Sequence, residues 1–157
     1  MYMDDQKALR EHLVELLDGK SAHIDLESGL KDFPLERIND KPAGSPHSAW
    51  QLLEHIRIAQ WDIFEFSTNA DYKEMKWPDE YWPTDEGTPD KWKASVTQTL
   101  DDLQSMRDLV ADDKTDLFAK IPHGGGQTIL REAMLVADHN AYHGGQIVLL
   151  RRMFENG

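Results

Sequence analysis

The chain has no cysteine among its 157 residues. This absence excludes disulfide bonds, thiolate metal ligands and a cysteine nucleophile, so any transition-metal site has to use histidine, aspartate or glutamate. No apolar run approaches the roughly 20 residues that cross a bilayer. The first five residues end in two aspartates and contain no hydrophobic core of a signal peptide. We therefore expect no membrane association, no secretion and a cytoplasmic location.

Basic residues are scarce relative to acidic ones. The 17 lysines and arginines face 29 aspartates and glutamates, which gives a formal net charge of −12 at pH 7. Nucleic-acid binding depends largely on lysine and arginine side chains that meet phosphates, so we expect no nucleic-acid partner. We interpret the acidity as a means of keeping the protein soluble. The length and the 39% hydrophobic content predict one domain that spans residues 1–157.

Period-two alternation is absent from the sequence, whereas four segments repeat apolar residues at helical spacing. They are residues 3–17, 45–67, 88–109 and 128–154. Ser45 followed by Pro46 has the cap-and-proline pattern of a helix start. Thr88 and Pro89 repeat this pattern, and Thr128 can cap the last helix.

Two long connectors separate these segments, residues 18–45 and residues 69–87. The first has short apolar patches with room for a helical turn or two. In the second, the aromatic residues of the 77–83 stretch either fold back over an edge of the core, which we favour, or line a ligand pocket. The whole pattern predicts an all-α fold, an antiparallel four-helix bundle with long crossover connectors.

The last segment places two histidines where its apolar stripe predicts buried side chains. His139 and His143 lie one helical turn apart on one face, so they can converge on one ion. His55 holds an inward position in the second segment in the same way. A lone inward histidine is usually a hydrogen-bonded core residue, and that interpretation stays open for each of the three. Two adjacent glycines, Gly144 and Gly145, either allow close helix packing or leave room beside an ion.

A shared ion explains the three inward histidines better than three separate core roles. Burying unpaired polar groups costs about 1–3 kcal/mol each, and one divalent ion satisfies three ring nitrogens at once. Three imidazoles with one open position are typical of zinc sites. We therefore predict a divalent transition metal, zinc, nickel or iron, on His55, His139 and His143. A peptidase of the HExxH type is excluded, because Asn140 stands in place of the general-base glutamate.

Other polar residues are weaker candidates for the site. Asp62 follows His55 by about two helical turns and returns to the same face, where it could orient a ligand or accept a proton. Gln146 follows His143 by about one turn and could hydrogen-bond a substrate. A solvated or capping role is an equal alternative for both. The remaining histidines are not taken as ligands: His12 is expected beside the core or behind the ligands, and His23, His47 and His123 in exposed positions.

Four stretches of the sequence carry a family resemblance. SAWQLLEHIRIAQWDIFEFS contains His55, and LREAMLVADHNAYHGGQIVLLRRMF contains His139 and His143. With KWPDEYWP and DLFAKIPHGGGQTILREA, which are similar to one subgroup, they cover most of the chain and resemble the DinB/YfiT-like family of metalloenzymes. The resemblance implies a four-helix bundle whose metal ligands are one histidine of the second helix and the His-x-x-x-His pair of the last.

The resemblance also implies a function. Some members of the family are thiol-dependent S-transferases or isomerases that use bacillithiol or mycothiol, with the metal activating the thiolate. We therefore expect a metal-dependent transferase of the thiol S-transferase type, or a hydrolase, in which the ion activates a low-molecular-weight thiol or water for a small-molecule substrate. The alternative is a non-catalytic stress or sensor bundle that binds a metal or ligand and whose ion is structural. The resemblance, with Trp50, Trp77 and Trp82 outside the clear core stripes, also leads us to expect a homodimer.

Overall fold

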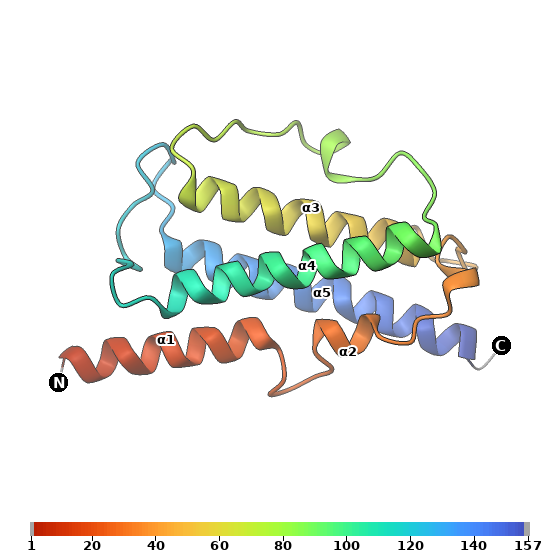
Figure 1. Ribbon diagram of the computed structural model, residues 1–157, viewed down its shortest axis with the longest axis horizontal. Helices are drawn as coiled ribbons and strands as arrows, with labels where there is room; N and C mark the ends of the chain where they lie inside the picture. The colour runs from red at the N-terminus through yellow and green to blue at the C-terminus, as the bar shows by residue number, and fades with distance from the viewer. Residues whose placement is uncertain (1, 156–157) are drawn as a thin grey trace.

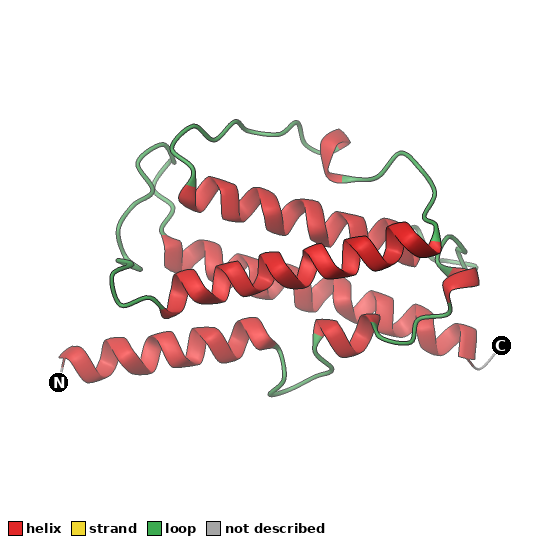
Figure 2. Ribbon diagram, viewed as in Figure 1, coloured by secondary structure: helices red, strands yellow, loops and turns green. Residues whose placement is uncertain are grey.

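The computed structural model describes residues 2–155, and every regular element in that range is a helix (Figure 1, Figure 2). The long helices in this range are α1 (Tyr2–Asp18), α3 (Ala49–Thr68), α4 (Pro89–Ala111) and α5 (Ile129–Glu155). The short ones are α2 (Leu26–Leu30) and the 3-10 turns η1 (Leu35–Arg37) and η2 (Asp79–Tyr81). The prediction of an all-α chain is confirmed, with α2 and η1 as helical turns of the first connector. None of the described helices is long and apolar enough to cross a membrane.

The long helices lie alongside one another but do not alternate in direction (Figure 1). Ser95 hydrogen-bonds Glu54. Further along both helices Gln60 hydrogen-bonds the Thr99 carbonyl, so α3 and α4 run parallel. By contrast, α5 runs opposite to α3, and α1 runs opposite to α4. The parallel pair departs from the expected antiparallel order, and the long connector between α3 and α4 is what allows it.

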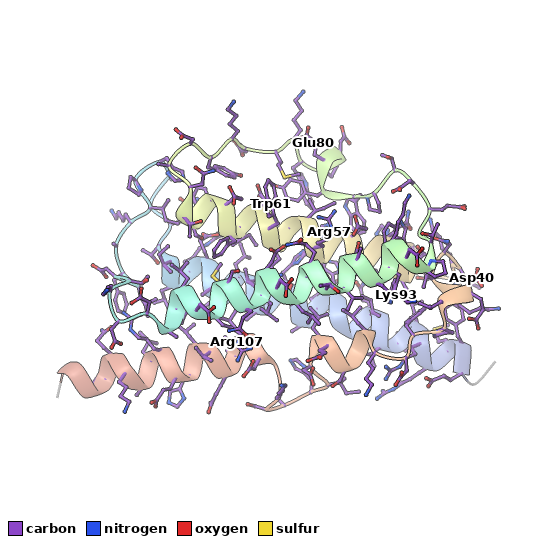
Figure 3. The ribbon with its side chains drawn as sticks, viewed as in Figure 1. Asp40, Arg57, Trp61, Glu80, Lys93 and Arg107 are labelled. Atoms are coloured by element: carbon purple, nitrogen blue, oxygen red, sulfur yellow. The ribbon has the colours of Figure 1, made fainter. Side chains whose placement is uncertain are left out.

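Two clusters of buried apolar side chains hold the helices together. They include Leu13, Met106 and Val136 in one cluster and Leu53, Ile56 and Ile147 in the other. A polar group completes the interface between α3 and α4 (Figure 3). Arg57 donates to the Glu54 carboxylate at 2.8 and 2.7 Å, and the Ser95 hydroxyl donates to the same carboxylate. These contacts set how α3 lies against α4.

Helix α3 begins later than the sequence pattern predicts. Its cap is Ser48, which accepts from the Gln51 backbone N–H while the Gln51 side chain accepts from the backbone N–H of Ser48. This reciprocal capping box satisfies two helix-end donors at once, whereas Ser45 belongs to the turn before it. Thr88 and Thr128 cap α4 and α5 as predicted.

The end of the second connector is held against the start of α3. Trp50 is 3% exposed and donates its indole N–H to the Asp85 carbonyl at 2.9 Å. Gly87 packs on the same ring so closely that a Cβ would lie 2.6 Å from it. Trp50 is therefore a core residue, contrary to the expectation that placed it outside the core stripes, and it no longer supports a dimer interface. Trp77, by contrast, is 69% exposed.

Candidate metal centre

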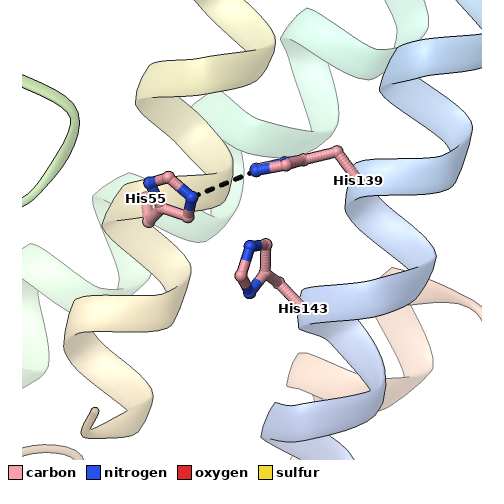
Figure 4. Close-up of side chains that lie close together, drawn as sticks. All are labelled: His55, His139 and His143. Atoms are coloured by element: carbon pink, nitrogen blue, oxygen red, sulfur yellow. Dashed lines mark hydrogen bonds between the residues drawn. The ribbon is translucent and has the colours of Figure 1, made fainter. Parts of the chain in front are cut away.

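His55 of α3 comes together with His139 and His143 of α5 between the two helices (Figure 4). One ring nitrogen of each histidine lies within 4.8 Å of those of the other two. The Nε2 atoms of His55 and His139 are 3.1 Å apart. His55 is buried and the other two are half-buried. The structure thus brings into one place the three residues that the helical spacing singled out.

A buried chain of amides fixes the register of the helices at this level. Asn140, which directly follows His139, donates to Oε1 of Gln60 at 2.6 Å. Gln60 in turn donates to the Thr99 carbonyl at 2.7 Å. All three are buried, where an unmade hydrogen bond costs about 1–3 kcal/mol. Sliding α5 along α3 would break this chain, so the histidines of the two helices are held opposite each other.

Two of the three histidines have their ring protons held by acceptors. The Nδ1 of His55 lies 2.8 Å from the Tyr81 carbonyl oxygen. The Nδ1 of His143 lies 2.6 Å from Oε1 of Gln146. Because both oxygens only accept, each Nδ1 donates and each Nε2 keeps its lone pair. Metal-bound histidines are held in this way, by an acceptor on the ring nitrogen that does not bind the ion.

The spacing of the ring nitrogens fits a metal ion. Two nitrogens bound about 2.0–2.1 Å from a tetrahedral zinc ion are about 3.3 Å apart, close to the 3.1 Å between His55 and His139. A nitrogen pair as wide as 4.8 Å has to close by about 1.5 Å for both nitrogens to bind one ion. The Nδ1 of His139 is buried without a hydrogen-bond partner among the described residues. The His139 ring therefore has no hydrogen bond at Nδ1 that would oppose a change of its orientation.

The surroundings keep the three imidazoles neutral. Burial, together with the nearby His143 and His55, lowers the pKa of His139 to about 3 from its ordinary 6.5. Burial also lowers the pKa of His55 and of His143, against an opposite effect of their hydrogen-bond acceptors. Histidine binds metal only in its unprotonated form, so all three rings are ready to bind an ion at neutral pH.

The connector between α3 and α4 packs onto His55. The Trp82 ring stacks on the His55 ring with 3.9 Å between centroids and 2° between planes. His47 stacks on the same tryptophan at 4.1 Å and 18°. Within the aromatic stretch 77–83, Trp82 therefore folds back onto α3 at the histidine group, whereas Tyr81 also lines a pocket, so each of the two expected roles holds for one residue. His47 is half-buried there, whereas its position at the predicted start of the second helix predicted exposure.

Asp62 contacts a neighbour of the histidine group, whereas Gln146 contacts one of the three histidines directly. Asp62 is 7% exposed and accepts from the hydroxyls of Tyr72, at 2.9 Å, and Tyr81, at 2.6 Å. Asp62 therefore anchors the residue whose carbonyl orients His55, whereas Gln146 orients a histidine directly. A proton-accepting role for Asp62 and a substrate-binding role for Gln146 remain predictions.

The helical spacing of apolar residues did not predict the connector residues that surround the three histidines. Tyr81 and Trp82 come from a connector without helical spacing. The signals that pointed to them were its aromatic content and the family resemblance of the KWPDEYWP stretch. No comparable signal marked His47. His12, expected beside the core or behind the ligands, instead faces solvent, and its side chain is 76% exposed. His23 and His123 are exposed, as expected.

These observations describe an all-helical protein with a three-histidine group of the kind that can hold a metal ion. The family model described as the DinB superfamily matches residues 21–147, a span that contains all three histidines. The chain belongs to the DinB superfamily. Neither the curated proteins nor the solved structures compared with the chain gave a match.

Proposed function

We propose that the protein binds one divalent transition metal ion through His55, His139 and His143 and is a metal-dependent enzyme of the thiol S-transferase type. The observation that carries the proposal is the pair of acceptors on two of the rings, which leaves their Nε2 lone pairs for an ion. Membership of the DinB superfamily, a metal-binding family, supports it. Zinc, nickel and iron all accept imidazole ligands.

The residues around the histidines prepare them for this role. When bound, the ion would act as a Lewis acid that lowers the pKa of a low-molecular-weight thiol or of water, and so supplies a nucleophile near neutral pH. The Tyr81 carbonyl and the Gln146 side chain hold the Nδ1 protons on the far side of their rings. Trp82 covers one face of the His55 ring and excludes water from it.

An enzyme needs an open position on its ion, whereas a structural ion usually has four protein ligands. Among the described residues no fourth histidine, aspartate or glutamate joins the three histidines. A cleft of about 280 Å³ is lined in part by His47 and Gln146. A recess of about 520 Å³ is lined in part by Tyr81 and Asp62. None of the three histidines lines either opening, so the lack of a fourth ligand among the described residues is what favours an enzyme over a non-catalytic stress or sensor bundle with a structural ion.

Metal analysis of protein purified without a nickel resin tests the ion. We expect one divalent ion per chain in the unaltered protein and little in His143→Ala, because two imidazoles bind far more weakly than three. Far-UV circular dichroism should show unchanged helix content, since the buried apolar clusters do not depend on this ring. His12→Ala, which removes an exposed histidine of α1, is the matched control and should keep its metal. Full occupancy in His143→Ala would overturn the proposal.

A thiol screen tests the activity. Metal-loaded protein is mixed with a fluorogenic electrophile and one of several low-molecular-weight thiols, and product formation is followed. We expect turnover with at least one thiol, its loss after chelation and its return when the metal is restored. A protein that holds its ion tightly and accelerates no thiol or water reaction would support the structural alternative instead.

A further inference from the structure

The recess of about 520 Å³ lies next to the metal centre, between α3, α5, the 69–87 connector and the loop before α5. Two of its residues tie it to the histidines. Tyr81 lines the recess and gives its carbonyl oxygen to His55. Leu135 lines it as well and precedes His139 by about one helical turn. A ligand held in the recess is therefore close to the candidate ligands of the ion.

The lining of the recess has an excess of negative charge. It contains the three carboxylates Asp62, Glu74 and Glu132 and one arginine, Arg131. Arg131 pairs with Glu132 at 2.7 Å, so two carboxylates of the lining have no cation of the lining to balance them. Burial, followed by Asp62 and Glu74, raises the pKa of Tyr72 to about 12, in keeping with this negative field. The recess disfavours anionic ligands and favours cations.

Aromatic rings form part of the same lining. Phe66 lies nearly perpendicular to both Tyr72 and His123, with 5.3 Å between ring centroids in each pair. Tyr72 and His123 are more nearly parallel, 6.0 Å apart. The π faces of aromatic rings attract cations, and more strongly where water is excluded. The rings and the carboxylates therefore favour the same class of ligand for independent reasons.

The side chain of Gln127 contributes a hydrogen-bond acceptor that no donor among the described residues pairs with. Gln127 is one of the residues that line the recess, and its Oε1 is buried and accepts no hydrogen bond from the residues that the structure describes. Buried acceptors are normally paired, and a ligand N–H would pair this one. A primary ammonium group brings N–H donors and a positive charge together, whereas a quaternary ammonium brings the charge alone.

We propose that the recess binds the primary ammonium group of an alkylammonium ligand, held by Asp62, Glu74 and the rings around them. The assignment of this ligand as the substrate of the metal centre rests on the proposed function. Binding of the ammonium group needs no ion, because none of the three histidines lines the recess. The two proposals can therefore fail separately.

Titrations followed by amide NMR shifts test the proposal in metal-free His143→Ala protein, where an amine has no ion to bind. The probes are n-butylammonium, neutral 1-butanol of the same length, and butanoate. We expect n-butylammonium to shift the amides of Gly124 and Gly125, which line the recess, and the other two to leave them in place. Glu74→Gln should weaken binding about two- to fivefold, and Tyr72→Leu should do so about two- to fivefold. Tyr72→Phe keeps the ring and should retain more of the affinity than Tyr72→Leu.

Glu86→Gln is the matched control, since it makes the same charge change at an exposed connector residue outside the recess. It should leave n-butylammonium binding unchanged. Equal weakening by Glu86→Gln and Glu74→Gln would overturn the proposal, because it would reduce the effect to attraction by the net charge of the protein. Binding of 1-butanol as tight as that of n-butylammonium, or shifts that lie away from the recess, would overturn it as well.

Discussion

The Tyr81 hydroxyl donates to the Asp62 carboxylate at 2.6 Å, while the carbonyl of the same tyrosine accepts from His55 at 2.8 Å. One connector residue is thus bound to α3 at two points, and one of these points is a candidate metal ligand. We predict that Tyr81→Phe lowers zinc affinity about tenfold, because the carbonyl loses its anchor and the imidazole its fixed orientation. Isothermal titration calorimetry measures the change.

Tyr72 offers the control for this prediction. Its hydroxyl donates to the same carboxylate at 2.9 Å, so Tyr72→Phe also takes one donor from Asp62 while leaving the contacts of Tyr81 intact. We expect a much smaller loss of zinc affinity than in Tyr81→Phe. Equal losses in the two variants would mean that the solvation of Asp62, and not the orientation of His55, sets the affinity.

The Gln146 side chain gives a second test of ring orientation. Gln146→Leu removes the acceptor from Nδ1 of His143, and we predict a loss of zinc affinity of about 10–100-fold. Gln146→Glu keeps an acceptor in the same place and should keep the affinity. Thermal unfolding of the metal-free variants should stay close to that of the unaltered protein, because Gln146 is only half-buried. Comparable losses with leucine and glutamate would contradict the prediction.

The low pKa of His139 predicts a pH-dependent stability for the metal-free protein. This pKa is about 3 in the folded protein against an ordinary 6.5, so the unfolded chain binds more protons between these values. The free energy of unfolding is therefore undiminished above pH 6.5 and falls as the pH decreases toward 3, by up to about 1.4 kcal/mol per pH unit. Urea titrations across this window measure the slope. His139→Gln should flatten it, and an unchanged slope would assign the effect to other groups.

Exposed apolar residues of α5 give a test of the expected homodimer. Tyr142 and Leu149 are 66% and 59% exposed and lie about two helical turns apart on one face. We predict that Leu149→Glu shifts the protein toward monomer in analytical ultracentrifugation, because it places a charge in a buried interface. Phe118→Glu, at a 54% exposed site in the loop after α4, should leave the dimer intact. An unaltered protein that is monomeric at high micromolar concentration would contradict the expectation.

Helical spacing was enough to predict the long helices and to single out His139 and His143, because both depend on residues about one turn apart in a single segment. It could not predict which helices run parallel. That order depends on pairs distant in sequence, such as the hydrogen bond from Gln60 to Thr99. The stacking of Trp82 on His55 is a contact of the same kind, and a sequence pattern does not encode it.

The surroundings of Gly144 and Gly145, next to His143, could not be predicted from the sequence either. A Cβ at Gly144 would meet Leu26 at 3.4 Å, whereas a Cβ at Gly145 would meet nothing within 4 Å. Gly144 therefore faces α2 at ordinary van der Waals distance and Gly145 faces open space, so the structure shows no close approach that requires glycine at either position. Adjacent residues point to different sides of a helix, and what lies on each side depends on the tertiary structure.

The parallel order of α3 and α4 sets the route of the chain between them. After Thr68 the polypeptide has to travel back along a helix of 20 residues, about 30 Å, before Pro89 can begin the next one. An antiparallel neighbour would have needed only a tight turn, and no segment would then have crossed the histidines. The long connector that this topology requires places Tyr81 and Trp82 against His55. Substitutions in the 69–87 connector can therefore change the surroundings of a bound ion without moving α3 or α5, the helices that carry the three histidines.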